Sequence, residues 1–319
     1  MARILLTAIG SFSAGIVIES LKTQGHTVIG CDLYQKAWVA DAYNVDKFYQ
    51  APNASDKEKF TAFIWEITEK EKIDFIIPLI DPEVELLAEL KKDFLEKNIV
   101  LCISDESAIR LCRNKYDITQ FLKQEFYDNI IPTNLLSNSG AIAFPIMIKP
   151  MLGRSSQGCE KVFDLKKFNY LKEVLIGENH IVQPFINGSV MTVDVVRDPI
   201  SDEVVCVSRR ELLRNPNGAG TTVEIIENYE LQRLCSLIVK KVGITGAVNL
   251  EFIEDESGAF NFLEINPRFS AGLAFSHLAG YNMTINHMNC FMGRPIEKRN
   301  RIKTMIIARK YEEYITLYR

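Results

Sequence analysis

The first hundred residues alternate between short apolar runs and longer stretches whose apolar positions repeat with a helical period. Short apolar runs bounded by glycine and polar residues predict buried strands, and the periodic stretches predict helices. The predicted strands cover residues 2–10, 26–33, 73–80 and 99–104, and the predicted helices lie within residues 11–25, 59–72 and 81–98. Strands that alternate with helices form βαβ units and hence a parallel sheet. The pattern therefore predicts an α/β domain at the N-terminus.

The rest of the chain mixes helical stretches with strands that alternate apolar and polar residues, which is typical of antiparallel sheets. Two antiparallel hairpins are predicted, over residues 189–212 and 246–270, with a helix over residues 230–243 between them. Other strands are predicted at residues 143–150 and 180–186, and other helices lie within residues 105–126, 163–175 and 285–293. Residues 301–319 predict a strand and then a segment without a clear pattern. This part is expected to be α+β.

The second hairpin carries polar residues that a buried strand normally avoids. Side chains two apart in a strand share a face, so Asn249 projects with Glu251, and Glu264 projects with Asn266. The midpoint between the two acids falls in the turn, so they are expected to lie opposite each other. Facing carboxylates destabilise a ladder unless a cation intervenes, and Mg²⁺ prefers oxygen ligands of this kind. The hairpin predicts either a magnesium site or a solvated acidic face.

Composition and charge exclude several classes of protein. The 319 residues are 47% hydrophobic and 24% charged with a formal net charge of −4, so no nucleic acid and no membrane partner is expected. Seven cysteines without a C-x-x-C pair predict reduced thiols and a cytoplasmic protein. No apolar stretch approaches the roughly 20 residues of a membrane span. Gly10 and Gly15, with Asp32 after the second strand, do not fit the spacing of a dinucleotide motif and are interpreted as turn glycines.

Three further features suit a nucleotide. Lys149 ends an apolar strand, and the polar loop Gly153–Gly158 that follows offers backbone N–H groups to phosphate oxygens. Residues 180–188 predict an extended segment of the kind that hydrogen-bonds an adenine edge. Lys115 is expected at a helix start. Taken singly, these features also fit a turn, an ordinary strand and a surface lysine.

Taken together, the pieces resemble the ATP-grasp superfamily, and most closely the synthetase modules of the carbamoyl-phosphate synthase large subunit. The resemblance covers nearly all of the chain and rests on the ordered motifs RNKYD, IMIKP, GRSSQG, IVQPFINGSVMTVDVV, NLEF and LEINPRFSAGLAFSHLAGYN. It implies a Rossmann-like pre-ATP-grasp domain over residues 1–105. It also implies a two-lobed ATP-grasp fold, with a small lobe over residues 106–185 and a large lobe with the metal-binding hairpin over residues 186–319.

The resemblance implies roles for single residues as well. The residues that would contact or cover the ATP phosphates are Lys115, Lys149, Gly153, Arg154, Ser155, Ser156 and Gly158. Those that would line the adenine slot are Gln183, Phe185 and Ile186. The metal ligands, for Mg²⁺ or alternatively Mn²⁺, would be Glu251, Glu264 and Asn266, with Asn249 beside them. Arg268 would stabilise the transferring phosphoryl group, and Arg268 and Lys149 are the implied catalytic residues.

The chain departs from the family pattern at two places. The acid that usually binds ribose is replaced by Val190, and we assign ribose to Asp194 only because it lies nearby in the sequence. The lid is also less rich in glycine than in the synthetase, because Arg154, Ser155, Ser156 and Gln157 occupy it. The arginines of SRRELLRNPNGAG, which are Arg209, Arg210 and Arg214, are expected either to face the acceptor substrate or to form a solvated strand end.

The family reaction implies an ATP-dependent C–N ligase. A carboxylate would attack MgATP to give an acyl phosphate and ADP, and an amine would then displace phosphate. The partners are then small-molecule carboxylate and amine substrates, and a homodimer is left open. One alternative is a carbamoyl-phosphate synthase-like kinase that acts on bicarbonate or carbamate. Another is a nucleotide-binding regulator without turnover.

Overall fold

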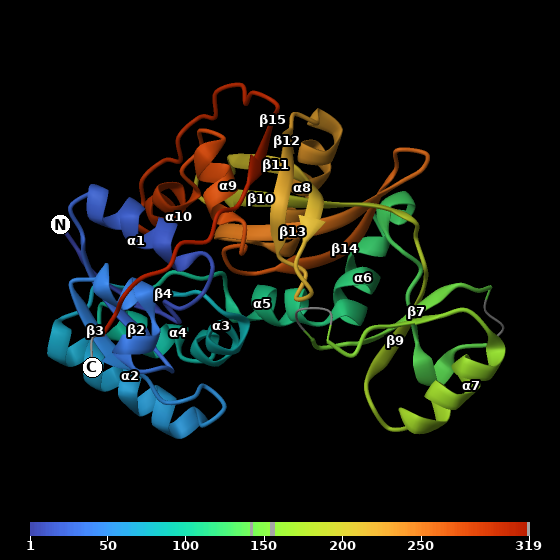
Figure 1. Cartoon of the computed structure of the whole chain (residues 1–319), viewed down its shortest axis with the longest axis horizontal. Coiled ribbons are helices and arrows are strands. Elements are labelled where there is room, and N and C mark those ends of the chain that lie inside the picture. Colours follow the sequence, from blue (N-terminus) through green and yellow to red (C-terminus); the bar gives the residue numbers. More distant parts are fainter. Residues whose placement is uncertain (141–142, 154–156, 318–319) are drawn as a thin grey trace.

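The computed structural model describes residues 1–140, 143–153 and 157–317. The strands of these residues form three sheets that lie in three parts of the molecule (Figure 1). The sheets fall within the ranges 1–105, 106–185 and 186–319, and the domain boundaries themselves stay a prediction. The predicted fold class is confirmed, because the first sheet is parallel and the two later sheets are antiparallel.

The N-terminal sheet has five parallel strands in the order β3-β2-β1-β4-β5. Its central strand is buried on both faces: Ile4 and Leu6 pack with Val17 of α1, and Leu5 packs with Phe60 of α2. A parallel strand covered on both sides reads as a continuous apolar run, as predicted. The elements are β1 (Arg3–Thr7), α1 (Ala14–Thr23), β2 (Thr27–Asp32), η1 (Lys36–Trp38), η2 (Ala40–Tyr43), β3 (Lys47–Gln50), α2 (Lys57–Glu71), β4 (Phe75–Pro78), α3 (Asp81–Ala88), α4 (Lys91–Glu96) and β5 (Val100–Leu101).

Two features of this part differ from the prediction. Strand β3 was not predicted, because it is a short edge strand without buried residues and has no apolar run. The single helix predicted within residues 81–98 is two helices, α3 and α4, with a turn at Glu89 and Leu90. After this turn Phe94 is fully buried and stacks on Trp65, with ring centroids 4.1 Å apart.

The largest sheet has six antiparallel strands in the order β14-β13-β10-β11-β12-β15. Helix α8 packs on β10 and β11, while α10 packs on β10 and β13, and their side chains belong to separate apolar clusters. The cluster with the α10 side chains also contains side chains of α1 and of the first sheet, so it joins the large sheet to the N-terminal part. The elements are β10 (Gly188–Arg197), β11 (Val204–Arg214), β12 (Gly220–Ile226), α8 (Tyr229–Val242), β13 (Gly246–Asp255), β14 (Phe260–Asn266), α9 (Leu273–Leu278), α10 (Met283–Phe291) and β15 (Met305–Ala308).

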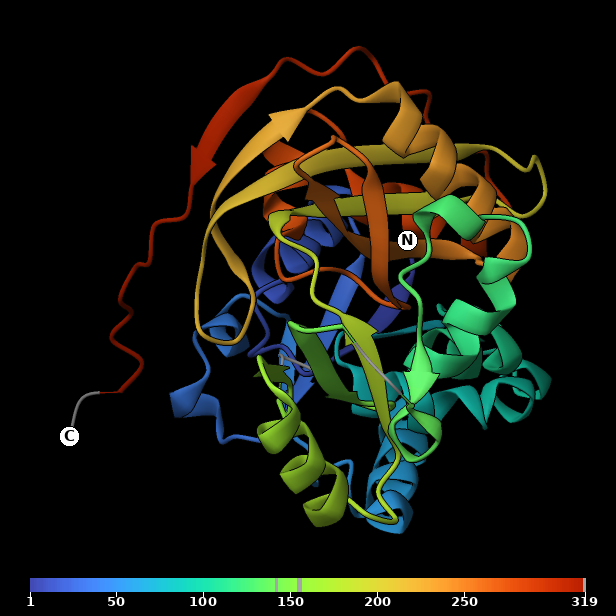
Figure 2. The same ribbon diagram turned by 90° about the vertical axis from the view of Figure 1, so that its right-hand side faces the viewer.

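The smallest sheet has four strands in the order β6-β9-β7-β8 and is covered by α7. Figure 2 shows this sheet and α7 below the six-stranded sheet. Helices α5 and α6 precede it, as the two predicted short helices, and α6 begins at Lys115 with Asn114 as its N-cap. The elements are α5 (Glu106–Arg113), α6 (Lys115–Lys123), η3 (Tyr127–Asn129), β6 (Asn134–Leu135), η4 (Leu136–Asn138), β7 (Ile146–Pro150), β8 (Glu160–Val162), α7 (Leu165–Val174) and β9 (His180–Pro184).

The end of the chain returns to the N-terminal part. After β15 has paired with β12, the chain continues to Thr316, whose Oγ1 donates to the carbonyl of Ala37 at 2.6 Å. Tyr43 Oη donates to the carbonyl of Thr316 at 2.7 Å. Strand β12 was not predicted, and no element was assigned to residues 221–226. Within the described residues, no helix has the length and apolar character needed to cross a membrane.

Candidate active site

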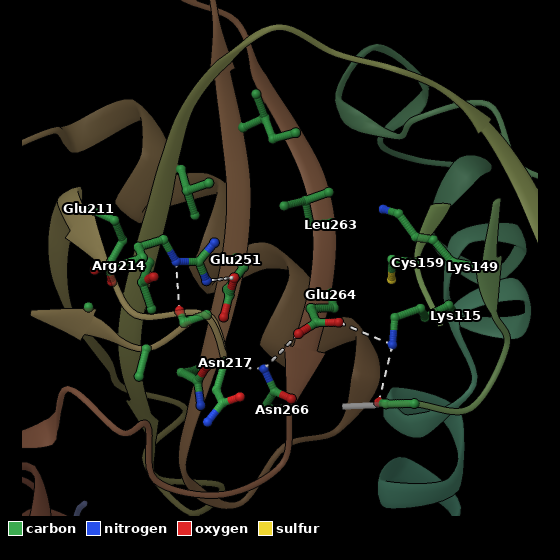
Figure 3. A pocket seen from close by; sticks show the side chains of 18 of the residues that line it. Lys115, Lys149, Cys159, Glu211, Arg214, Asn217, Glu251, Leu263, Glu264 and Asn266 are labelled. Atoms are coloured by element: carbon green, nitrogen blue, oxygen red, sulfur yellow. Dashed lines mark hydrogen bonds and ion pairs between the residues drawn. The ribbon is translucent and has the colours of Figure 1, made fainter. Parts of the chain in front are cut away.

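One large pocket of about 720 Å³ lies between the four-stranded and six-stranded sheets (Figure 3). It is lined by residues of β7, β9, β10, β11, β13 and β14 and by the loop between β11 and β12. The structure thus brings together most of the predicted site residues, which are Lys115, Lys149, Gly153, Gln183, Phe185, Ile186, Asn249, Glu251, Glu264, Asn266 and Arg268. Gly158 is described but does not line this pocket. The predicted lid residues Arg154, Ser155 and Ser156 lie outside the described residues.

The two predicted carboxylates face each other on paired strands. The strands β13 and β14 pair with Glu251 opposite Glu264 and Asn249 opposite Asn266, so the predicted register is confirmed. Burial, together with the negative charge of Glu264, raises the pKa of Glu251 to about 7. Burial alone would also raise the pKa of Glu264, but Lys115, the Asn266 amide and the charge of Lys149 together lower that pKa. The surroundings therefore stabilise the negative charge of Glu264 and disfavour that of Glu251.

Both carboxylates have a cationic partner from another element. Lys115 Nζ lies 3.1 Å from Glu264 Oε2, and Arg214 Nη2 lies 3.1 Å from Glu251 Oε2. Figure 3 shows these two cations on opposite sides of the acidic pair. Asn266 Nδ2 donates to Glu264 Oε1 at 3.3 Å and to Asn249 Oδ1 at 3.2 Å, which orients both amides beside the acids.

The donor set of this hairpin fits Mg²⁺. Two carboxylates and neighbouring amides are hard oxygen ligands, and Mg²⁺ is commonly held by one or two carboxylates with phosphate and water completing the shell. Among the described residues, no group of three or more His, Cys, Asp and Glu side chains forms a metal cage. A cation on Glu251 and Glu264 would therefore take its other ligands from a bound substrate and water.

Lys149 lies across the pocket from the hairpin. Its Nζ donates to Gln183 Oε1 at 2.9 Å, and Gln183 Nε2 donates to Thr133 Oγ1 at 2.8 Å. Burial lowers the pKa of Lys149. The pairing of β7 with β9 explains why Lys149 and Gln183 meet. Met147 is the ladder partner of Gln183, and Lys149 lies two residues further along β7 on the same face. Lys149 and the acidic pair thus face a common space.

The predicted adenine slot is a mixture of backbone and aromatic groups. The backbone N–H of Phe185 donates to the carbonyl of Pro145 at 3.0 Å, so it is already used within the protein. Lys161 Nζ lies 3.2 Å from the centroid of the Phe185 ring. The sequence did not single out the other residues of this end, which include Ile131, Met147, Cys159, Lys161 and Leu263. They carry no motif and are brought to the pocket only by the sheet.

Arg268 lines the pocket but is also tied to the N-terminal part. Its Nε and Nη2 lie 3.1 Å and 3.0 Å from the two carboxylate oxygens of Asp81, which begins α3. Such a bidentate pair holds the guanidinium plane in one orientation. The sequence pointed to Arg268 but gave no sign of Asp81, because the two are 187 positions apart.

The assignment of ribose to Asp194 is corrected by the structure. Val190 and Thr192 line the pocket, but Asp194, further along the same face of β10, does not. Its Oδ2 accepts from Arg209 Nη1 at 2.8 Å and from Ser276 Oγ at 2.6 Å, and the residue is buried. Asp194 therefore neutralises Arg209 beneath the pocket instead of facing a ligand.

The three arginines of β11 separate into two groups. Arg209 and Arg214 line the pocket together with Gly218 and Gly220 of the following loop. Arg210 does not, and it pairs with Glu224 and Glu254 at 2.7 Å and 2.8 Å. Arg209 and Arg210 are successive residues and therefore point to opposite faces of β11. Register shifts between Glu211 and Arg214 bring Arg214 to the pocket side together with Arg209.

Several residues at this end of the pocket were missed. Glu211 is 3% exposed and accepts from Arg209 Nε at 3.1 Å. A Cβ on Gly220 would lie 1.9 Å from Glu211 Oε2, so a side chain there would displace the Glu211 carboxylate. Phe12 reaches the pocket from the N-terminal part, and the loop Ser270–Gly272 lies beside Arg209. The nearby glycines and arginines were visible in the sequence, but no signal marked Phe12 or Glu211.

Comparisons with known proteins agree with this architecture. Residues 177–314 match the family described as ATP-grasp in the biosynthetic pathway with Ter operon, and residues 4–102 match the PylC-like N-terminal domain. A formate-dependent phosphoribosylglycinamide formyltransferase of Prochlorococcus marinus (strain MIT 9312) is 24% identical, over 99% of this chain and 83% of the relative. The N-terminal section of a carbamoyl phosphate synthase large chain from Aquifex aeolicus is 23% identical, over 84% of this chain and 52% of the relative.

Among solved structures, the complex of biotin carboxylase with β,γ-ATP from Campylobacter jejuni superimposes with a TM-score of 0.79. It is 19% identical and covers 95% of this chain and 74% of the other, so it supports the fold alone. The predicted resemblance and the predicted enzyme class, an ATP-dependent ligase, are confirmed by these comparisons. Residues 177–314 thus match an ATP-grasp family, and a PylC-like domain precedes them in the chain.

Proposed function

We propose that the chain is a carboxylate–amine ligase that uses MgATP to activate a carboxylate as an acyl phosphate. The single observation that carries this proposal is the pair Glu251 and Glu264, face to face on β13 and β14 at one wall of the pocket. A lysine from a different element, Lys149, lies half-buried on the opposite wall. Acids on one side and a half-buried cation on the other suit a metal-bound triphosphate between them.

The proposed roles follow from the contacts. Glu251, Glu264 and Asn266 would hold Mg²⁺, which neutralises charge on the transferring phosphoryl group when it is bound. Lys115 and Lys149 would bind the phosphates, and Gln183, Phe185 and Ile186 would line the adenine slot. Arg268, oriented by Asp81, would stabilise the charge that develops at the acceptor carboxylate. No residue forms a covalent bond to the substrate in this scheme, since phosphoryl transfer depends on positioning and charge neutralisation.

The loop Gly153–Gly158 is proposed to close over the phosphates. An acyl phosphate hydrolyses in water, so a covered pocket protects it until the amine arrives. Lys115 Nζ donates to the carbonyl of Gly153 at 3.4 Å, which places the start of this loop beside the acidic pair. The amine would then attack the acyl carbon and release phosphate.

ADP release is the experiment that tests this proposal. The purified chain would be incubated with MgATP and a panel of carboxylates, each with and without amino acids or other amines. We expect ADP and phosphate only when a suitable acid and amine are both present, together with an amide product in the mass spectrum. ATP turnover that no acid or amine stimulates would contradict the proposal.

A second candidate is a kinase that acts on bicarbonate or carbamate. The similarity to a carbamoyl phosphate synthase section favours it. The same assay distinguishes the two candidates. Bicarbonate-stimulated ADP release without an added organic acid would favour the kinase, whereas release that requires an organic acid and an amine would favour the ligase.

A further inference from the structure

The acidic pair and its two cations form a neutral group of four charges. Glu264 is paired with Lys115 at the start of α6, and Glu251 is paired with Arg214 at the end of β11. A divalent cation that takes both carboxylates would therefore leave Lys115 and Arg214 without their anions. Two positive side chains would then face the pocket next to the metal.

Arg214 is held at the pocket wall by a second contact that does not involve the acids. Its Nε donates to the carbonyl of Gly218 at 2.6 Å, in the loop between β11 and β12. That loop lines the end of the pocket that also contains Phe12 and Ser270. When Glu251 turns to a metal, the contact with Gly218 keeps the guanidinium at this end. A planar guanidinium in such a place suits a carboxylate group.

We infer that Arg214 binds a carboxylate group of the acceptor substrate, and that Glu251 masks Arg214 until a divalent cation binds. The acceptor therefore carries a carboxylate that Arg214 holds while the reacting group is positioned near Arg268. Metal and acceptor binding strengthen each other, because each of them removes the competitor of the other. This inference rests on the proposed function, since it requires a cation on Glu251 and Glu264.

The two neighbouring arginines of β11 cannot serve in the same way. Arg209 is buried and bonds to Asp194, Glu211 and Ser270, none of which is a proposed metal ligand. Arg210 pairs with Glu224 and Glu254 and does not line the pocket. Arg210 therefore provides a matched control, because it is an arginine of the same strand with its own carboxylate partners.

The first test measures the binding of Mn²⁺ alone, by electron paramagnetic resonance at about pH 8.5. We expect Arg214→Ala to bind Mn²⁺ roughly two- to fivefold more tightly than the wild type, because a partly exposed ion pair no longer competes for Glu251. Arg214→Lys and Arg210→Ala are expected to match the wild type. Unchanged or weaker Mn²⁺ binding by Arg214→Ala would overturn the inference.

The second test uses acetate as a simple carboxylate probe, followed by saturation-transfer difference NMR. In the wild type we expect the acetate signal to rise at least about twofold when Mg²⁺ and ADP are added, since Arg214 is then released. The rise is expected in Arg210→Ala and not in Arg214→Ala. An equal rise in Arg214→Ala would show that the anion binds elsewhere and would overturn the inference.

A failure of the proposed function is recognised separately. Glu264→Ala is expected to lose Mn²⁺ binding in the presence of ADP, while the wild type retains it. If the wild type itself retains no Mn²⁺ with ADP, the proposed metal site is wrong. If the wild type and Glu264→Ala behave as expected but Arg214→Ala equals the wild type, only the role of Arg214 is wrong.

Discussion

The two ends of the pocket are built in different ways. The nucleotide end is formed by β7, β9 and the hairpin β13–β14, and its proposed charged groups are two acids and two lysines. The other end is formed by arginines that are all paired with acids, and by Phe12 from the loop between β1 and α1. The first end depends on local strand pairing, whereas the second depends on how the N-terminal part packs on the large sheet.

This difference has a consequence for specificity. A site built from one hairpin and one small sheet can be kept unchanged while the rest of the fold varies, which suits a nucleotide common to many enzymes. A site built from Phe12, the Arg268–Asp81 pair and the loop after β11 changes whenever the packing of these parts changes. We therefore expect the nucleotide end to set catalysis and the other end to set the choice of acceptor.

Loss of a carboxylate at the nucleotide end is expected to have the largest effect. Glu264→Ala should lower ATP turnover by about 10³-fold or more, because it removes a ligand of the ion that stabilises the transferring phosphoryl group. The measurement is steady-state ADP release, with circular dichroism to show that the fold is intact. Glu256→Ala, in the exposed turn of the same hairpin, serves as the control. Wild-type turnover in Glu264→Ala would show that the metal assignment is wrong.

Loss of Lys149 tests the nucleotide end of the pocket through nucleotide binding alone. Lys149→Ala should weaken nucleotide binding by about 1–3 kcal/mol, as expected when a charge-assisted contact is lost. Calorimetry with a non-hydrolysable ATP analogue measures it. Lys166→Ala, an exposed lysine of α7, should leave the affinity unchanged. Equal affinities for Lys149→Ala and the wild type would place the phosphates elsewhere.

The free energy of unfolding is expected to depend on pH through the buried His287. Burial lowers the pKa of His287 to about 4, and its Nδ1 accepts from the backbone N–H of Ala247 at 2.8 Å. The unfolded chain binds this proton more readily, so stability falls as the pH falls below about 6.5.

Between pH 8 and pH 5 this group should account for a loss of about 2 kcal/mol in the free energy of unfolding. Urea unfolding at the two pH values measures the loss, and His287→Gln should show a smaller pH-dependent change than the wild type. His277→Gln provides the control, because it removes a histidine from the neighbouring helix α9. The same pH dependence in His287→Gln and the wild type would assign the effect to other groups.

Loss of the Arg268–Asp81 pair, which joins the pocket to the N-terminal part, is expected to have the smallest effect on turnover. Asp81→Asn should lower turnover by about tenfold, because Arg268 loses its bidentate partner and with it part of its orientation. Nucleotide affinity should stay within about twofold of the wild type, since the nucleotide end is not touched. Asp105→Asn, an exposed residue that pairs with Lys91, is the control. A loss of nucleotide affinity in Asp81→Asn would show that the two ends are not independent.

The sequence by itself determined the elements with strong periodicity and the local part of the site. Apolar runs predicted β1, β2 and β4, and the distances of Glu251 and Glu264 from their shared turn predicted that they face each other. The turn limits the possible registers to neighbouring ones, and a register shift between Glu251 and Phe252 then sets Glu251 opposite Glu264. The motifs then placed Lys115, Lys149, Gln183 and Arg268 in one ordered set, and all four line the pocket.

Only the tertiary structure decided the rest. The sequence could not show that Asp81 orients Arg268, that Arg214 rather than Arg210 contacts Glu251, or that Asp194 is covered by Arg209 and Ser276. Most of these contacts join residues far apart in the chain, up to the 187 positions between Asp81 and Arg268, and the order of the residues in the sequence does not set the distance between them. Pattern and motif act over a few residues, whereas the end of the pocket opposite the nucleotide exists only where separate sheets pack together.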